Sequence, residues 1–233
     1  VSNIPPIDFG RRLKELIRYP YGCSEQTTSS VFPQLYLQNV MEVDERLMDY
    51  TNKNIKEGIR KLGNMLLANG GFRYWQDAVA ANDWVTSYAG HFMIEAEKKG
   101  YSLPVGFKDK WIKYQENAAK SWRQNANQYY DYYYHHHLTQ AYRLYTLALA
   151  NAPDLSNMNR LRELPGLTPM AKWQLAGAYV LAGQIEVAKQ LITNLQAEVP
   201  TYSLMNDSYG SDLRDMAIIL ETLVLMGEKE KAG

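Results

Sequence analysis

The stretch from Thr168 to Leu195, TPMAKWQLAGAYVLAGQIEVAKQLITNL, is typical of two helices joined by a tight turn. Thr168 and Pro169 suit an N-cap and a first helical turn, because the hydroxyl accepts a backbone hydrogen bond and proline fixes a helical φ. Gly183 ends the first helix. Each helix carries apolar or small residues at helical spacing: Met170, Trp173, Gly177 and Val180, then Ile185, Ala188, Leu191, Ile192 and Leu195. The stretch therefore predicts a helical hairpin.

Similar helix openings recur elsewhere and extend this prediction to the whole chain. Small and aromatic residues mix at residues 84–88 (WVTSY), 138–142 (LTQAY) and 213–217 (LRDMA). No segment shows the alternation of apolar and polar residues expected of a strand. A further helix is marked by apolar residues at helical spacing, ending before Gly227: Leu213, Met216, Ala217, Leu220, Leu223 and Val224. The periodicity predicts an all-α chain of helical hairpins.

Composition narrows the class of protein. The chain has 233 residues, of which 46% are apolar, enough for one large domain with a substantial core. Lys plus Arg is 25 and Asp plus Glu is 25, so bulk charge does not attract nucleic acid or an anionic membrane. No apolar stretch approaches the length of a membrane span, and no signal peptide is visible. Because the chain starts at Val1, we expect it to be a piece of a longer protein.

The single cysteine, Cys23, rules out a disulfide within the chain and is either an inert buried residue or a chemical centre. Its surroundings, YPYGCSEQTTS over residues 19–29, place Gln26 three residues away. If the chain turns tightly, the Cys23 sulfur can attack the Gln26 carboxamide and expel ammonia, which closes a thiolactone ring of roughly fifteen atoms. Pro20 and Gly22 suit such a turn. The ring carbonyl would then acylate amines or hydroxyls.

A helix is predicted to begin at this motif. Val31, Leu35 and Leu37 have helical spacing, and Pro33 is expected to kink the helix or to limit its first part. Glu25 falls in the first turn, where the helix dipole favours a carboxylate, so we prefer that role over a general base.

The residues Cys23 to Gln26 resemble the Cys-Gly-Glu-Gln thioester motif of the alpha-2-macroglobulin and complement family. The flanks, Tyr-Pro-Tyr-Gly before and Thr-Thr-Ser after, resemble the bacterial branch, and the resemblance covers nearly the whole chain. It includes the segments at residues 70–75 (GGFRYW), 84–88 (WVTSY) and 209–215 (YGSDLRD). Ser24 departs from the vertebrate motif, which has glycine there. Since glycine tolerates any turn that serine adopts, Ser24→Gly is predicted to leave the chemistry largely intact.

The resemblance implies an α/α toroid and places residues 1–233 in one thioester domain of a larger multidomain protein, incomplete at its C-terminus. Cys23 and Gln26 would form the thioester, flanked by Tyr19, Tyr21, Gly22, Ser24 and Glu25. The tyrosines would either shield the thioester or belong to the core. The family traps proteases covalently through lysine amines after cleavage of a bait region, so the chain is expected to be an inhibitor domain and not an enzyme. No cofactor or metal is implied, and the expected location is periplasmic or at the cell surface, through a lipid-anchored parent.

The consecutive histidines His135, His136 and His137 form a second candidate site. Adjacent side chains point in different directions and cannot all bind one metal ion, so we predict no metal site. The resemblance implies that a histidine from this region can modulate the thioester, whereas packing at a helix start is the simpler interpretation. His91 lies within a helical pattern and is expected in the core or lining a groove.

Three other functions are compatible with parts of the sequence. A helical-repeat binding module would need no chemistry at Cys23. A hydrolase of the α/α-toroid class would need acidic residues in a central cavity, and no carboxylate pair here has spacing that indicates one. A complement-like opsonin would use the same thioester but transfer it to surface hydroxyls.

Overall fold

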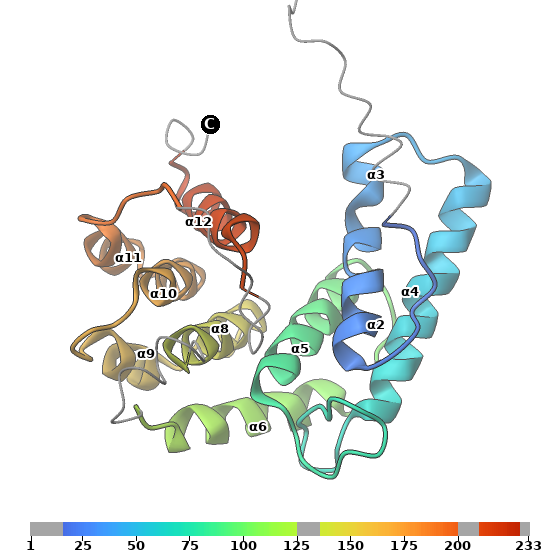
Figure 1. Ribbon diagram of the computed structural model, residues 1–233, viewed down its shortest axis with the longest axis horizontal. Coiled ribbons are helices and arrows are strands. Elements are labelled where there is room, and N and C mark those ends of the chain that lie inside the picture. The colour runs from blue at the N-terminus through green and yellow to red at the C-terminus, as the bar shows by residue number, and fades with distance from the viewer. Residues whose placement is uncertain (1–15, 125–135, 200–209, 229–233) are drawn as a thin grey trace, which may run out of the picture. The chain divides into compact units, whose positions relative to one another are not determined.

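The computed structural model describes residues 16–124, 136–199 and 210–228, and its contacts divide the chain into two units, residues 1–110 and 111–233, which are treated separately (Figure 1). In the described residues, extended pairing is limited to isolated bridges, among them those between Leu66 and Phe72 and between Arg73 and Ala81. Everything else that is regular is helical, so the predicted all-α class is confirmed. No helix in these ranges is both long and apolar enough to cross a lipid bilayer.

The first unit is built around the short helix α2, which packs against two longer helices, α4 and α5 (Figure 1). Gly58 on α4 allows the close approach, because a Cβ added there would lie 2.8 Å from a Val31 methyl on α2. The helices of this unit are α2 (Ser24–Val31), η1 (Pro33–Tyr36), α3 (Leu37–Val40), α4 (Glu45–Met65), α5 (Asp83–Lys98) and the start of α6 (Phe107–Ser121).

Pro33 limits the helix that begins at the motif, as its sequence position predicts. The α-helix ends at Val31, and Pro33 occupies the first turn of the 3-10 helix η1. Proline has no N–H to continue the α-helical ladder, which explains the change of helix type. The segment is therefore helical but interrupted, and both parts of the prediction are confirmed.

The loop between α4 and α5 is held at both ends by polar contacts. Asn82 caps α5 by accepting from the Val85 N–H at 2.9 Å. Phe72, fully buried, donates its N–H to the Thr86 hydroxyl at 2.9 Å, and its carbonyl accepts from the Asn82 N–H at 2.9 Å. The Arg73 N–H donates to the Met65 carbonyl at 3.1 Å. The loop backbone is thus fixed to the end of α4 and to the start of α5.

The second unit contains the predicted hairpin. Thr168 caps the first helix by accepting from the Ala171 N–H at 3.4 Å, and Gly183 adopts φ +75° in the turn, a conformation that suits glycine. The first helix of the hairpin, α10, packs on α8, α11 and α12. The helices are α8 (His136–Leu149), α9 (Leu155–Arg162), α10 (Pro169–Leu181), α11 (Ile185–Ile192) and α12 (Asp212–Met226).

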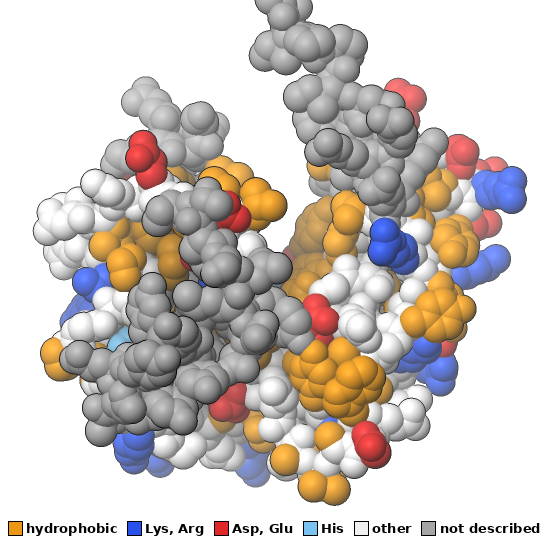
Figure 2. All heavy atoms as spheres, viewed as in Figure 1, with side chains coloured by type: hydrophobic (Ala, Val, Ile, Leu, Met, Phe, Trp, Pro, Cys, Tyr) orange, Lys and Arg blue, Asp and Glu red, His pale blue; other side chains and the backbone are white. Residues whose placement is uncertain are grey.

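The helix α12 is confirmed, but most of the apolar face that reveals it in the sequence lies on the surface. The exposed fractions are 72% for Leu213, 48% for Leu220 and 62% for Val224, whereas Leu223 is 3% exposed. Figure 2 shows apolar side chains at the surface over α12. The buried face is Asp215, Ile218, Ile219, Thr222 and Leu223. The spacing identifies the helix, but it does not identify the side of the helix that packs on α10.

His91 on α5 is partly buried, with its ring edge-on to Phe32 at a centroid distance of 4.9 Å. Burial lowers the pKa of His91 from 6.5 to about 4, against the opposing charge of Glu95 and with help from Lys98. In the unfolded chain the His91 imidazole therefore binds a proton near pH 6.5, whereas in the folded chain it binds that proton only near pH 4. Stability should be constant above pH 6.5 and should fall by up to about 3 kcal/mol as the pH drops toward 4.

Urea unfolding at several pH values measures this effect, with His91→Gln as the comparison. The difference in unfolding free energy between wild type and variant should change between pH 6.5 and 4 and stay constant above that range. Parallel curves would show that His91 is not the titrating group.

Candidate functional site

Cys23 and Gln26 contact each other at the N-terminus of α2 through a reciprocal pair of hydrogen bonds. The Cys23 N–H donates to Oε1 of Gln26 at 3.1 Å. In return, the Gln26 N–H donates to Sγ of Cys23 at 3.5 Å. This is a capping box in which cysteine takes the position that serine or threonine usually holds. The tight turn that the motif predicts is therefore present, and the sulfur and the carboxamide lie on the same helical turn.

Gly22 supplies the space that the Gln26 carboxamide occupies. Its φ is +93°, a conformation that L side chains rarely adopt. A Cβ built on Gly22 would lie 1.9 Å from Oε1 of Gln26 and 2.9 Å from Cδ. The carboxamide thus rests directly against the Gly22 backbone, so this position requires glycine for both its conformation and its contact.

Ser24, the first residue of α2, joins the helix to the α4–α5 loop. Its N–H donates to the Tyr74 carbonyl at 3.0 Å, and its hydroxyl donates to the Arg73 carbonyl at 2.7 Å. The Ser24 residue is fully buried. One of the N–H groups that a helix start leaves without a helical partner is thereby satisfied by the loop.

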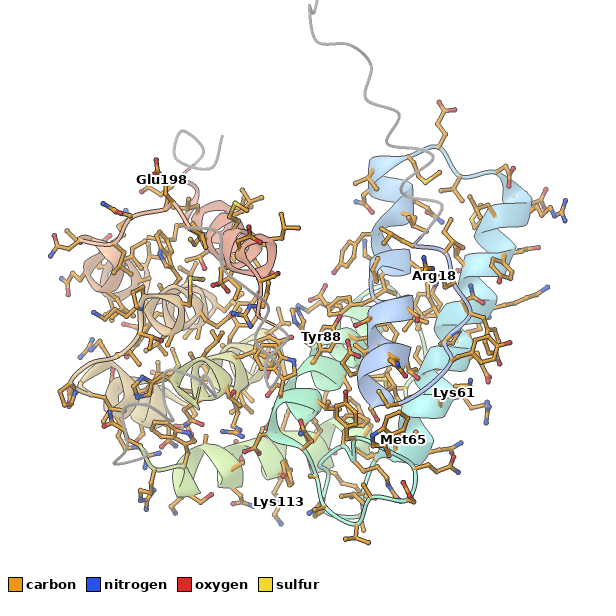
Figure 3. All side chains as sticks on the ribbon, viewed as in Figure 1. Arg18, Lys61, Met65, Tyr88, Lys113 and Glu198 are labelled. Carbon is orange, nitrogen blue, oxygen red and sulfur yellow. The ribbon has the colours of Figure 1, made fainter. Side chains whose placement is uncertain are left out.

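The segment before Cys23 is attached to α4 by Tyr19 and Lys61. Lys61, labelled on α4 in Figure 3, donates to the Pro20 carbonyl at 2.7 Å, and its ammonium lies 4.7 Å from the Tyr19 ring centroid and 5.2 Å from that of Tyr21. The Tyr19 hydroxyl donates to Glu57 at 3.0 Å. Tyr19 is 36% exposed and Tyr21 71% exposed, so neither is a core residue.

The Glu57 carboxylate stays charged over the physiological range. A hydrogen bond from Arg60, together with the one from Tyr19, lowers the pKa of Glu57 to about 2. The ring contact between Tyr19 and Tyr21, with centroids 4.4 Å apart, adds to the same surface cluster. The turn before the cysteine is therefore held to α4 in part by a hydrogen bond to a carboxylate that is ionised near neutral pH.

Glu25 lies on the outer side of α2 and interacts with a hydroxyl pair. The Ser29 hydroxyl donates to Glu25 at 2.6 Å and lies 3.2 Å from the Tyr88 hydroxyl of α5. Figure 3 labels Tyr88 on α5. Burial raises the pKa of Tyr88. Glu25 is therefore engaged in a helix-to-helix contact, in keeping with its predicted place in the first turn.

Cys23 and Gln26 differ sharply in burial. Cys23 is 1% exposed, whereas Gln26 is exposed. The Gln26 residue is therefore open to solvent, while Cys23 lies beneath the surface. The hydrogen bond from the Cys23 N–H polarises the carbonyl and would stabilise the negative charge that builds on its oxygen during attack.

Of the three consecutive histidines, only His137 has a described side chain. His135 falls outside the described residues, and only the backbone of His136 is described, at the start of α8. His137 is 2% exposed, with its ring centroid 6.1 Å from that of Trp122. These residues belong to the second unit, whereas Cys23 belongs to the first. Over the ranges that the structure describes, no group of three or more His, Cys, Asp or Glu side chains could hold a metal ion.

Sequence reasoning did not identify Lys61, Thr86 or the Arg73 and Tyr74 carbonyls as parts of this site. A carbonyl leaves no trace in residue type, and Lys61 lies on a helix far along the chain. The one available signal was the clustering of GGFRYW and WVTSY at residues 70–75 and 84–88, which the structure explains as the loop and the helix start that hold α2.

Comparison with known proteins finds relatives of the chain in one family. Residues 7–117 match the A-macroglobulin TED domain. The Escherichia coli K12 alpha-2-macroglobulin is 35% identical over 109 residues, which cover 45% of this chain and 7% of that protein. The chain thus spans less than a tenth of that relative.

Solved structures agree over more of the chain. Native Escherichia coli alpha-2-macroglobulin, from domain MG7 to the C-terminus, superposes with a TM-score of 0.80 and 26% identity, covering 99% of this chain and 38% of that one. Salmonella alpha-2-macroglobulin reacted with methylamine gives a TM-score of 0.76 and 28% identity, covering 99% of this chain and 16% of that one. This likeness confirms the predicted fold class, an α/α toroid of helical hairpins. The chain is therefore similar to the bacterial alpha-2-macroglobulins, over residues 7–117 in its match to the TED domain and over nearly its whole length in its fold.

Proposed function

We propose that Cys23 and Gln26 form an internal thioester through which this chain attaches covalently to attacking proteases. The reciprocal hydrogen bonds between the two residues are the observation that carries the proposal, because they bring the sulfur and the carboxamide into one helical turn before any bond forms. Proximity and fixed orientation of this kind remove much of the entropic cost of ring closure.

The proposed reaction has two steps, thioester formation and transfer to an amine. In the first, Sγ adds to Cδ of Gln26, the bond from Cδ to nitrogen breaks, and ammonia leaves with the thiol proton. In the second, a lysine amine of the target attacks Cδ, the bond from Cδ to sulfur breaks, and the sulfur takes up the proton that the amine loses. The product is an isopeptide bond and a free Cys23 thiol. Each site reacts once, so the chain is a trap and not an enzyme.

Support for proteases as targets comes from the relatives. The Escherichia coli protein has been solved after activation by trypsin and by porcine elastase, and the Salmonella protein after reaction with methylamine. By analogy, we assign to this chain a proteolytic trigger elsewhere in a larger multidomain parent, other domains of that parent as partners, and a periplasmic or cell-surface location with lipid anchoring of the parent. We also propose that residues 1–233 form one domain of that parent.

The test uses the complete natural protein. Wild type should have lost one ammonia by intact mass, should incorporate methylamine at Gln26, and should release a thiol at Cys23 that a thiol reagent labels. Cys23→Ala should abolish all of these signals. Ser30→Ala, which deletes a hydroxyl bond to the Gln26 backbone carbonyl inside the same helix, should preserve them.

Undiminished amine incorporation in Cys23→Ala would place the chemistry elsewhere. A wild-type protein with neither ammonia loss nor a thiol released by protease cleavage would favour the helical binding module. A wild-type thioester that prefers glycerol to methylamine would favour the opsonin.

A further inference from the structure

The first turn of α2 is held by a second segment of the chain, and Ser24 makes both connections. Its hydroxyl reaches the Arg73 carbonyl at 2.7 Å, and its N–H reaches the Tyr74 carbonyl at 3.0 Å. Ser24 lies between the two candidate reacting residues and is fully buried. The hydroxyl contact depends on serine, because glycine at this position would keep only the amide contact.

The two accepting carbonyls belong to a loop that is itself fixed. The N–H of buried Phe72 donates to the Thr86 hydroxyl at 2.9 Å, and the Arg73 N–H donates to the Met65 carbonyl at 3.1 Å. The anchors lie on α5 and at the end of α4. Ser24 therefore ties the start of α2 to a backbone whose own position is set by two longer helices.

Anchoring matters at this place because helix ends fray. The first turn of an isolated helix lacks intrahelical partners for its N–H groups and opens at little cost in free energy. Opening of this turn would separate Sγ of Cys23 from the Gln26 carboxamide, since both contacts between them span the turn. A misplacement of about 1 Å between reacting groups can slow a reaction by about a hundredfold.

We propose that Ser24 is a positioning residue for thioester formation, and that its hydroxyl bond to the Arg73 carbonyl holds the Cys23–Gln26 turn in the geometry that reacts. This inference rests on the proposed thioester. It also revises the expectation for Ser24→Gly, which should now behave like Ser24→Ala, because both variants lose the hydroxyl.

The experiment compares Ser24→Ala and Ser24→Gly with Thr28→Val in the complete natural protein. Thr28 is the matched control, since its hydroxyl is also fully buried and donates to a backbone carbonyl at 2.7 Å, but that carbonyl belongs to Ser24 within the same helix. Intact mass measures the fraction that has lost ammonia at a fixed time after synthesis, and urea unfolding measures stability. The Ser24 variants should show about a three- to tenfold lower fraction than Thr28→Val at similar stability.

A second measurement keeps the proposal testable if a Ser24 variant does not fold. Hydrogen exchange in the wild-type protein should show the Ser24 and Gln26 amides protected well beyond an ordinary frayed first turn. Exchange at the rate of a frayed end would overturn the positioning role. Equal ammonia loss in Ser24→Ala and Thr28→Val would overturn it too and leave the proposed thioester standing, whereas a wild type without ammonia loss would overturn the thioester itself.

Discussion

Replacing Gly22 by alanine is expected to lower the yield of thioester by about a hundredfold or more. The alanine Cβ would lie 1.9 Å from Oε1 of Gln26, so the carboxamide must leave its place against the backbone. The φ of +93° adds strain of about 1 kcal/mol for any residue with a Cβ. Once the carboxamide moves, its hydrogen bond from the Cys23 N–H is lost, and with it the contact that holds the carboxamide beside Cys23.

Gly183→Ala separates backbone strain from the loss of space. Gly183 has φ +75° and nothing within 4 Å of an added Cβ, so its substitution strains the chain without a clash. Both variants should lose a similar amount of stability from strain, but Gly183→Ala should form the thioester normally. Intact mass and methylamine incorporation give the comparison. Equal yields in the two variants would mean that the contact between Gly22 and Gln26 does not matter for the chemistry.

Leu223→Ala in α12 is expected to cost about 2–5 kcal/mol of unfolding free energy, whereas Leu220→Ala should change it by less than about 0.5 kcal/mol. The two leucines lie on the same helix and undergo the same chemical change. They differ in burial, since Leu223 is 3% exposed and Leu220 is 48% exposed. Deleting a buried side chain loses its transfer free energy and leaves a cavity, while an exposed one is already in contact with water.

Urea unfolding of the two variants, fitted with a common slope, measures the difference. A large loss in Leu220→Ala would show that the outer face of α12 is covered in solution. A small loss in Leu223→Ala would show that the contact of α12 with α10 contributes little to stability.

The sequence could predict much of this fold because its signals are local. Thr168, Pro169 and Gly183 mark the ends of a hairpin through capping and backbone conformation, which depend on a few neighbouring residues. Pro33 ends α2 for an equally local reason, the missing N–H. These predictions hold because tertiary contacts have little freedom to change them.

The packing of α12 could not be predicted in the same way. Its apolar spacing is helical on more than one face, and Asp215 and Thr222 are buried although they are polar. Thr222 satisfies its hydroxyl with the Trp173 carbonyl of α10 at 3.1 Å, and Asp215 pairs with Arg214 at 2.6 Å. The Trp173 carbonyl lies outside α12, so the sequence of α12 alone does not reveal which of its faces packs on α10.

The candidate site likewise combines local features, which the sequence predicts, with contacts between distant segments, which it does not. Cys23, Gln26 and the need for a turn at Gly22 were visible in the motif, since their chemistry and spacing are local. The anchoring of Ser24 to residues 73–74 and the contact of Lys61 with Tyr19 and Tyr21 depend on segments that only the fold brings together. The sequence is compatible with a shielding or a core role for Tyr19 and Tyr21, and their exposure excludes the core.

The capping box at Cys23 has a consequence for the spent state of the protein. If an amine adds to Gln26 as proposed, the adduct is an N-substituted glutamine, and its carbonyl oxygen can still accept from the Cys23 N–H, as Oε1 does in the described structure. The helix start that aligns the groups before the reaction also fits the product. Covalent capture should therefore leave the stability of α2 and of the residues around it nearly unchanged. The captured protein would then be attached to a domain that is still correctly folded.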